Sequence, residues 1–269
     1  MLDFSRKTRH QKEMDALCKK EQNFSDRHVS KQESALNCLL AKKVPPKLQQ
    51  TLDLAFEKAF ALVFEKGTGV IEKTYKKDEI EKEYQINQYA DEIYQSRKSL
   101  KKFSKKAGQK SSANFVLSGI AGIGMGAIGI GIPDIPIFTG MLLKCIYEIA
   151  LNFGYEYGSE KEKYFILLVI EGAVSYGGHF EEINRKVDKF IGSERLPGDY
   201  QQTEQIKYTS GMLSKELLYM KFLQGLPIVG VVGGAYDAVY MKQISEYARL
   251  KYHKRFLIRT MQGNNSGDT

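Results

Sequence analysis

Apolar residues recur at three- and four-residue intervals along most of the chain, which is the spacing that places them on one face of an α-helix. Leu52, Phe56 and Phe60 show this spacing most clearly. Pro46 can open the helix that contains them, because proline suits a first helical position, and Gly67 is a stop signal. The pattern predicts an amphipathic helix between Pro46 and Gly67.

A second helix is predicted from Asp78 to about Ala107, with Ile93 and Phe103 among its buried contacts. Five lysines recur at helical spacing near its end and therefore line one face, roughly opposite the apolar positions; they are Lys98, Lys101, Lys102, Lys105 and Lys106. One interpretation of this face is a solvated surface stripe. The other is contact with an anionic membrane surface, where each nearby lysine gains ~1 kcal/mol.

The next segment is the most unusual in the chain, because residues 111–133 carry no charge and six of the twenty residues from 113 to 132 are glycine. Gly124, Gly126 and Gly129 match the nucleotide-binding pattern G-x-G-x-x-G, but no strand precedes them, as that site requires. A transmembrane helix is the second interpretation. The length is right, since ~20 apolar residues span a bilayer, although so much glycine weakens the helix.

The third interpretation, which we favour, is close packing between helices. Gly122 and Gly126 have the four-residue spacing of small residues that lets two helix backbones approach each other. Gly230 and Gly234 repeat this spacing in a second glycine-rich segment. We therefore expect both glycine-rich apolar segments to be helical and to pack in the core.

Helical periodicity also marks the apolar segments at residues 137–158, 161–177 and 216–257. The β-branched residues near position 230 would suit a buried strand, but the helical pattern on both sides favours α-helix throughout. The sequence thus predicts an all-α, multi-helix fold.

The proline pair at positions 45 and 46 marks the expected start of the domain, since two successive prolines cannot lie inside a helix. We expect the domain to span residues 44–262. Residues 1–43 are polar and basic and are expected to form an extension with room for one docking helix. Residues 263–269 are expected to be a disordered tail.

Positive charge is concentrated in two places along the chain. The net charge of the 269 residues is +8, yet residues 97–110 hold seven Lys and Arg and residues 249–259 hold five more, without an acid in either range. Such basic segments suit an anionic partner. Three cysteines without a C-x-x-C pair and the lack of an apolar leader at the N-terminus indicate a cytoplasmic location.

Candidate chemistry is sparse. The four histidines are too scattered for a metal site, and no catalytic motif or phosphate-binding loop is present, so we expect neither a metal nor a cofactor. Asp134, between two prolines, and Asp237, in the second glycine-rich segment, are the two candidate functional residues. Each carboxylate either stabilises a helix N-terminus by ~0.3–1 kcal/mol or performs a task. The two would form one site if the glycine-rich segments touch.

Three stretches of the chain show a likeness to a known family. They are GIPDIPIFTGMLLKCIYEIALNFGYEYG (131–158), KGTGVIEKTYKK (66–77) and LPIVGVVGGAYDAVYMKQISEYARLKYHKRFL (226–257). Together they resemble the bacterial EcsC family, which takes its name from a protein encoded beside an ABC transporter. The resemblance covers about residues 44–260 and leaves 1–43 outside. It implies an α-helical, cytoplasmic, membrane-peripheral protein of unestablished molecular function, and it supplies no catalytic residue.

These observations favour a non-enzymatic accessory protein that acts beside the inner membrane surface, in association with a transporter or another membrane protein. Two alternatives stay open: a hydrolase with a site near Asp134 and Asp237, and a protein whose glycine-rich segments insert conditionally into a bilayer. Nucleic-acid binding is disfavoured because the lysine face lacks the interleaved aromatic residues on which bases stack. The oligomeric state is left open.

Overall fold

The computed structural model describes residues 7–30, 45–66, 69–110, 134–224 and 233–265, and every regular element in these ranges is an α-helix. The all-α fold is confirmed. The helices are α1 (Arg9–Val29), α3 (Pro46–Lys66), α4 (Gly69–Glu72), α5 (Lys77–Tyr94), α6 (Arg97–Lys110), α7 (Asp134–Asn152), α8 (Glu160–Val174), α9 (Gly177–Ser193), α10 (Gln202–Gln224) and α11 (Gly233–Asn265).

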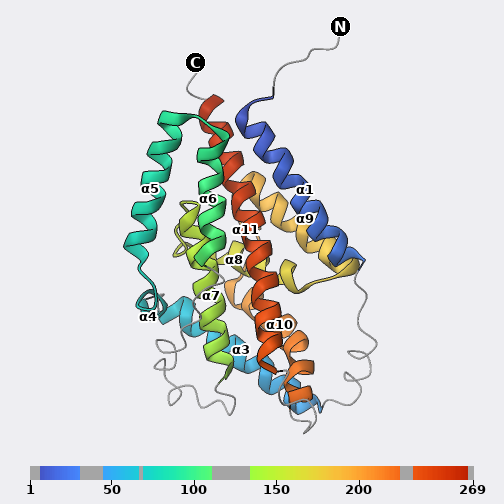
Figure 1. The fold of residues 1–269 in the computed structure, drawn as a ribbon. Coiled ribbons are helices and arrows are strands. Elements are labelled where there is room, and N and C mark those ends of the chain that lie inside the picture. The colour runs from blue at the N-terminus through green and yellow to red at the C-terminus, as the bar shows by residue number, and fades with distance from the viewer. Residues whose placement is uncertain (1–6, 31–44, 67–68, 111–133, 225–232, 266–269) are drawn as a thin grey trace.

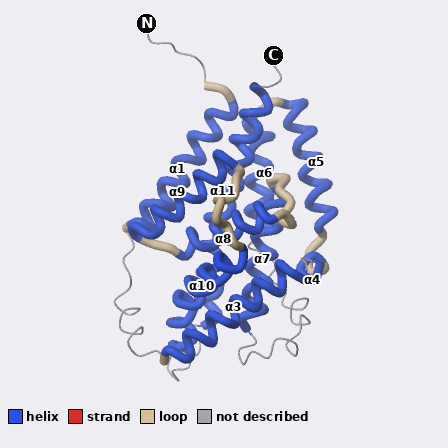
Figure 2. The backbone as a smooth tube through the Cα atoms, turned by 180° about the vertical axis from the view of Figure 1, so that it is seen from behind, coloured by secondary structure: helices blue, strands red, loops and turns tan. Residues whose placement is uncertain are grey.

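Three helices form the centre of the bundle: α7, α8 and α11. Helix α11 packs against both α7 and α8, while α3, α5 and α6 contact α7, and α9 and α10 contact α8. The long helix α11 runs up the front of the molecule and the described part of the chain begins and ends at the same end of the bundle (Figure 1). The view from behind shows α3 and α10 crossing the opposite end (Figure 2). Helix α3 begins at Pro46, as the sequence predicts.

The single helix predicted from residue 78 to 107 is in fact two helices, α5 and α6. The prediction was wrong because the chain turns at residues 95–96. Gln95 ends α5 in the left-handed conformation, with φ 41°. The Ser96 hydroxyl then accepts a hydrogen bond from the Ser99 N–H at 3.1 Å and caps α6. The turn changes which residues are buried: Phe103 of α6 lies in the core, whereas Ile93 of α5 is 58% exposed.

Helix α1 lies in the segment that the sequence sets apart as an extension. It starts with a capping box, in which Thr8 Oγ1 accepts from the Gln11 N–H at 3.2 Å and Gln11 Oε1 accepts from the Thr8 N–H at 2.8 Å. Leu17 and Phe24 are fully buried against the rest of the protein, and α1 contacts α6, α9 and α11. Residues 9–29 therefore share the core of the bundle.

Helices α8 and α11 approach each other closely at a glycine. A Cβ atom on Gly172 of α8 would lie 2.6 Å from Cε1 of Tyr247 on α11, too close for any side chain. Tyr247 is fully buried there and its hydroxyl donates to Asn184 Oδ1 at 2.8 Å. Glycine thus does allow tight helix packing in this protein, at a position that the sequence analysis did not single out.

A salt bridge between α8 and α11 is buried inside the bundle. Arg255 Nη1 lies 2.7 Å from Glu162 Oε2, and both side chains are at most 7% exposed. The Tyr252 hydroxyl donates to the other Glu162 oxygen at 2.6 Å. Burial raises the pKa of Glu162, while Arg255 and Tyr252 oppose that shift by stabilising its ionised form. The guanidinium also lies 4.1 Å from the ring centroid of Tyr155.

Three more cations of α11 also have partners within the protein. Lys251, only 2% exposed, lies 2.8 Å from Glu21 of α1 and 2.8 Å from Asp188 of α9, and Lys254 contacts the same two carboxylates. Arg259 donates to the Phe153 carbonyl at 2.9 Å. The second basic segment of the sequence, residues 249–259, is therefore largely internal rather than a free basic surface.

We expect Arg255→Met to destabilise the protein by about 3–5 kcal/mol, because it leaves the Glu162 carboxylate buried without its cation. Urea unfolding followed by circular dichroism measures this change. The double variant Arg255→Met with Glu162→Gln should recover part of the loss, since no unpaired buried charge remains. Equal losses in the single and double variants would contradict this account of the salt bridge.

Candidate functional site

The exposed face of α6 is the most distinctive charged surface among the described residues. Lys98, Lys101, Lys102 and Lys105 are all exposed, and within the described part of the chain none of them has an ion-pair partner. We call these four residues the α6 lysine face. The fifth predicted lysine, Lys106, differs because it is only partly exposed and forms a salt bridge with Glu83 of α5.

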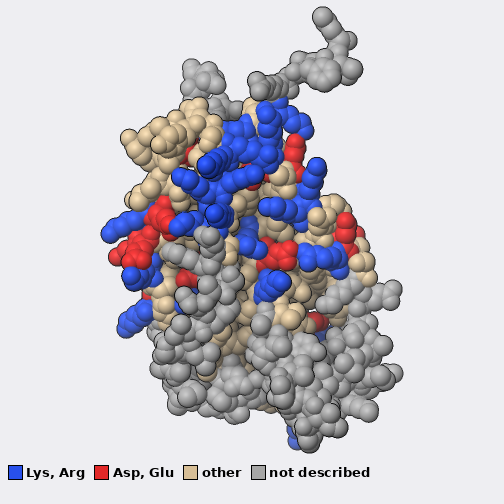
Figure 3. All heavy atoms as spheres, in the orientation of Figure 1, with Lys and Arg blue, Asp and Glu red and all other residues tan. Residues whose placement is uncertain are grey.

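The opposite face of α6 explains why the lysines point outward. Leu100, Phe103 and Ala107 are each at most 2% exposed and pack into the core, as the periodicity of the sequence predicts. Lysines four residues apart then lie on the solvent side for the same geometric reason. Figure 3 shows Lys and Arg gathered on the upper half of this side of the molecule, over α6 and the helices next to it.

Helix α5, which packs beside α6, carries an exposed apolar stripe. Ile86, Tyr89 and Ile93 are 67%, 66% and 58% exposed and share one helix face, because they are three and four residues apart. We call these three residues the α5 stripe. Uncharged surface over the upper part of α5 adjoins the basic area in Figure 3. The sequence pattern alone does not reveal the stripe, because it predicts Ile93 to be a buried contact of the helix.

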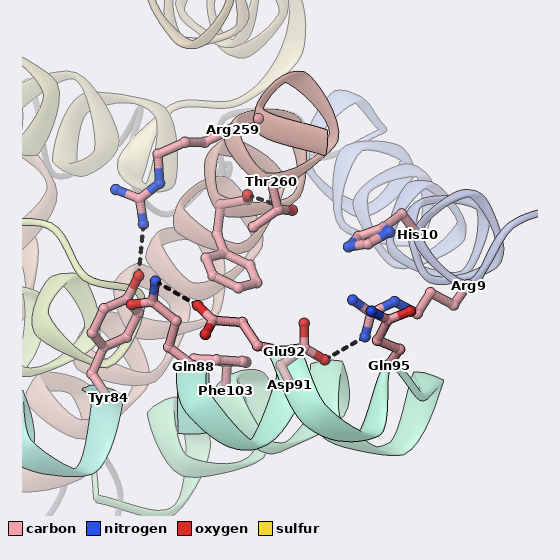
Figure 4. A pocket seen from close by; sticks show the side chains of 12 residues that line it. Arg9, His10, Tyr84, Gln88, Asp91, Glu92, Gln95, Phe103, Arg259 and Thr260 are labelled. Carbon is pink, nitrogen blue, oxygen red and sulfur yellow. Dashed lines mark hydrogen bonds and ion pairs between the residues drawn. The ribbon is translucent and has the colours of Figure 1, made fainter. Parts of the chain in front are cut away.

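A cavity of about 370 Å³ lies between α1, α5, α6 and α11 at the same end of the bundle. Figure 4 shows interactions that join several of its polar side chains. Arg9 of α1 lies 2.5 Å from Asp91 of α5, and Arg259 of α11 donates to the Tyr84 hydroxyl at 3.1 Å. Burial and the Arg9 charge lower the pKa of His10, and Asp91 opposes this. These contacts attach α5 to α1 and α11. The side chains around the cavity therefore stabilise the packing of these helices.

The two candidate aspartates lie in helices that start at the same end of the bundle. Cys145 Sγ is 3.0 Å from Ser245 Oγ, and the rings of Phe153 and His253 stack at 5.4 Å. Both contacts join residues 100 positions apart, so α7 and α11 run parallel in a fixed register. Asp134 and Asp237 therefore both lie near the starts of these two helices. Their side chains lie outside the described residues.

The predicted packing glycines also lie mostly outside the described residues: Gly122, Gly126 and Gly230 do, while Gly234 falls in the first turn of α11. Within the described ranges, one helix is long and apolar enough to cross a membrane. It is α7, with a mean hydropathy of 1.3 over Ile135–Asn152, and 72% of that window is buried inside the bundle. A helix in the core of a bundle can have the same length and hydropathy as a membrane-spanning one.

The described residues contain no group of three or more His, Cys, Asp or Glu side chains that could hold a metal ion. His179 and Glu182 lie one helical turn apart on α9, at 3.9 Å, but both are well exposed. His179 Nε2 instead shares a hydrogen bond with the Tyr208 hydroxyl at 3.0 Å. This histidine is a surface residue that links α9 to α10.

Two buried groups have strongly shifted pKa values, one lowered and the other raised. Burial lowers the pKa of His253 on α11 to about 4. Burial raises the pKa of Glu171 on α8 to about 7, although hydrogen bonds from Thr209 and Gln205 oppose the shift. Both groups therefore favour the neutral form in the folded state.

Comparisons with known proteins agree with the resemblance seen in the sequence. The model of the EcsC protein family matches residues 8–257, so the similarity includes α1 and extends further towards the N-terminus than the expected residue 44. Protein EcsC of Bacillus subtilis (strain 168) is 28% identical over 142 residues, which span 52% of this chain and 56% of that protein. No solved structure matches the chain.

The shifted pKa values of His253 and Glu171 predict that the stability of the fold depends on pH. Substitution of each residue separates the two contributions. Below its unfolded pKa of about 6.5, His253 takes up a proton only on unfolding, so stability is lost as the pH falls from about 6.5 to 4. Glu171 acts in the other direction: the folded state keeps its proton until about pH 7, so stability is lost as the pH rises from about 4.5 to 7.

We therefore expect Glu171→Gln to gain stability relative to the unsubstituted protein as the pH rises from 5 to 8, by up to about 3 kcal/mol for a shift of this size. Urea unfolding at a series of pH values measures the difference. A difference that stays constant with pH would show that Glu171 does not titrate abnormally in the folded protein.

Proposed function

The chain belongs to the EcsC protein family, and from that premise we propose that it is a non-enzymatic accessory protein that binds the anionic cytoplasmic surface of a membrane. The α6 lysine face is the observation that carries the proposal. Its four cations are exposed and have no ion-pair partner among the described residues, unlike Lys251, Lys254 and Arg255 of α11. A membrane protein at that surface, such as a transporter, is the partner class that the family resemblance implies.

The magnitude of the lysine contribution supports a membrane surface as the partner. A lysine close to anionic lipid gains about 1 kcal/mol, so four on one helix face supply up to about 4 kcal/mol, or roughly a thousandfold in partition. Each side chain gives up little on binding, because none of the four breaks an ion pair with the described residues. An internal partner would have competed with the lipid headgroups.

The α5 stripe adds an apolar component beside the cationic one. Isoleucine and tyrosine side chains suit the boundary between headgroups and acyl chains, where tyrosine keeps its hydroxyl in the polar layer. Ile86, Tyr89 and Ile93 together expose an apolar surface that has no cover in the bundle. Lysine attraction and shallow apolar contact then act on neighbouring helices.

We expect the full-length protein to float with vesicles that contain anionic phosphatidylglycerol and not with neutral phosphatidylcholine vesicles. Replacing the α6 lysine face by glutamine, in a variant with Lys98→Gln, Lys101→Gln, Lys102→Gln and Lys105→Gln, should lower the partition at least tenfold, since most of the Coulombic gain is removed. Flotation at several salt concentrations measures the effect, and high salt should weaken binding in the same way.

The matched control removes four positive charges elsewhere, by glutamine at four exposed lysines of α3, α8 and α10; they are Lys47, Lys58, Lys161 and Lys207. This control has the same net charge and should keep most of the vesicle binding. Equal loss in both variants would mean that only overall charge matters. Absence of vesicle binding by the unsubstituted protein would end the proposal.

The lack of tryptophan in the chain offers a direct test of the α5 stripe. In a Tyr89→Trp variant we expect the emission maximum to shift to the blue on addition of anionic vesicles, because the indole leaves water. A Leu54→Trp variant places the reporter on α3 at a similarly exposed site and should show no shift. Vesicle binding without any shift in the Tyr89→Trp variant would leave lysine contact in place and exclude insertion of the stripe.

A further inference from the structure

A second cavity lies on another part of the bundle, away from the α6 lysine face. It has a volume of about 800 Å³, is open on one side, and is lined by α8, α9, α10 and the connecting segment 194–201. Binding sites for small molecules usually measure about 300–1,000 Å³. The cavity therefore has the size of a ligand site, and the proposed membrane contact does not use it.

The walls of this cavity are largely aromatic. Tyr164 packs edge-on against Tyr200 at 5.0 Å and is tilted against Phe190 at 5.3 Å. Leu168, Leu196 and Tyr208 also line it. Aromatic side chains held by such mutual contacts form a preset surface for another flat ring, since ring pairs favour stacked or edge-to-face geometry.

The inner end of the cavity is polar and contains unpaired hydrogen-bonding atoms. Glu171, 2% exposed, accepts from the Thr209 hydroxyl at 2.6 Å. Gln205 donates to the Tyr164 carbonyl at 3.3 Å, but its buried Oε1 has no partner among the described residues, and neither has the buried Tyr200 hydroxyl. Buried polar atoms left unpaired are costly. A ligand with an N–H or O–H group at this depth would satisfy the Gln205 acceptor.

The mouth of the cavity is cationic. Lys186, Lys189 and Arg195 lie at its rim with one acid, Asp199. Lys186 is held by Glu182 at 2.8 Å, whereas Lys189 and Arg195 are exposed and have no ion-pair partner in the described ranges. An anionic group on the outer end of a ligand would meet these two cations.

We infer that this cavity binds a small planar aromatic molecule with a hydrogen-bond donor at its inner end and a carboxylate or similar anion at its outer end. Each part of the cavity accounts for one part of that ligand. The unpaired acceptor of Gln205 suits its hydrogen-bond donor, the tyrosines suit its ring, and Lys189 with Arg195 suits its anion. The inference does not depend on membrane binding, because the two sites use different helices.

Indole-3-propionate is the probe that tests the inference, since it carries a ring N–H at one end and a carboxylate at the other. The protein contains no tryptophan, so excitation near the red edge of indole absorption reports the probe alone. Fluorescence anisotropy of the probe titrated with the full-length protein should show saturable binding. Two relatives of the probe separate its parts: 3-methylindole lacks the carboxylate, and 1-methylindole-3-propionate lacks the N–H donor.

We expect each altered probe to bind about tenfold more weakly than indole-3-propionate, because an unpaired buried acceptor or a lost ion pair has that order of effect. The variant Lys189→Ala with Arg195→Ala should reduce the advantage of the carboxylate to about twofold or less. A Gln205→Leu variant, which removes the unpaired acceptor, should reduce the advantage of the N–H group in the same way.

The control replaces two exposed cations far from the cavity, in Lys47→Ala with Lys58→Ala, and should bind all three probes as the unsubstituted protein does. Thermal unfolding confirms that each variant is folded, and the rim variant changes only exposed side chains. The inference is overturned if indole-3-propionate shows no saturable binding. It is also overturned if the rim variant retains the full preference for the carboxylate.

Discussion

The burial of Arg255 against Glu162 is the interaction on which the arrangement of this protein depends. Both charges lie within the bundle and 2.7 Å apart, and each would be strongly destabilising without the other. Because Arg255 belongs to α11 and Glu162 to the start of α8, the pair fixes how far α11 is rotated about its axis. That rotation decides which of its other residues face inward.

The consequence reaches the surface of the molecule. With α11 in this orientation, Lys251 and Lys254 meet Glu21 and Asp188, which attaches α1 and α9 to the central helix. Cations that would otherwise form a second basic surface are thereby neutralised inside. The α6 lysine face has no ion-pair partners among the described residues and lies on the helix next to the apolar stripe of α5. This combination supports the proposed contact with an anionic membrane.

The bundle also separates two kinds of candidate site. In the cavity beside Arg9 and Arg259, both arginines are paired and their contacts join helices. The cavity beside Glu171 contains a buried amide oxygen and a tyrosine hydroxyl without partners among the described residues. Satisfied polar groups stabilise a fold, while unsatisfied ones at the end of an aromatic cavity leave hydrogen-bonding capacity for a ligand. Membership of the EcsC family does not say which of the two cavities binds a ligand.

The sequence by itself determined the helical class, the start of α3 at Pro46, the family, and the outward position of the α6 lysines, because each follows from local spacing or from motifs. Only the tertiary structure decided that Lys251 and Arg255 are buried, that Ile93 is exposed, and that Glu171 lines a cavity. Periodicity gives the polarity of a helix face, but whether that face is covered depends on residues distant in sequence. Lys251 forms an ion pair with Glu21, 230 positions away in the sequence. A local pattern cannot predict such a contact.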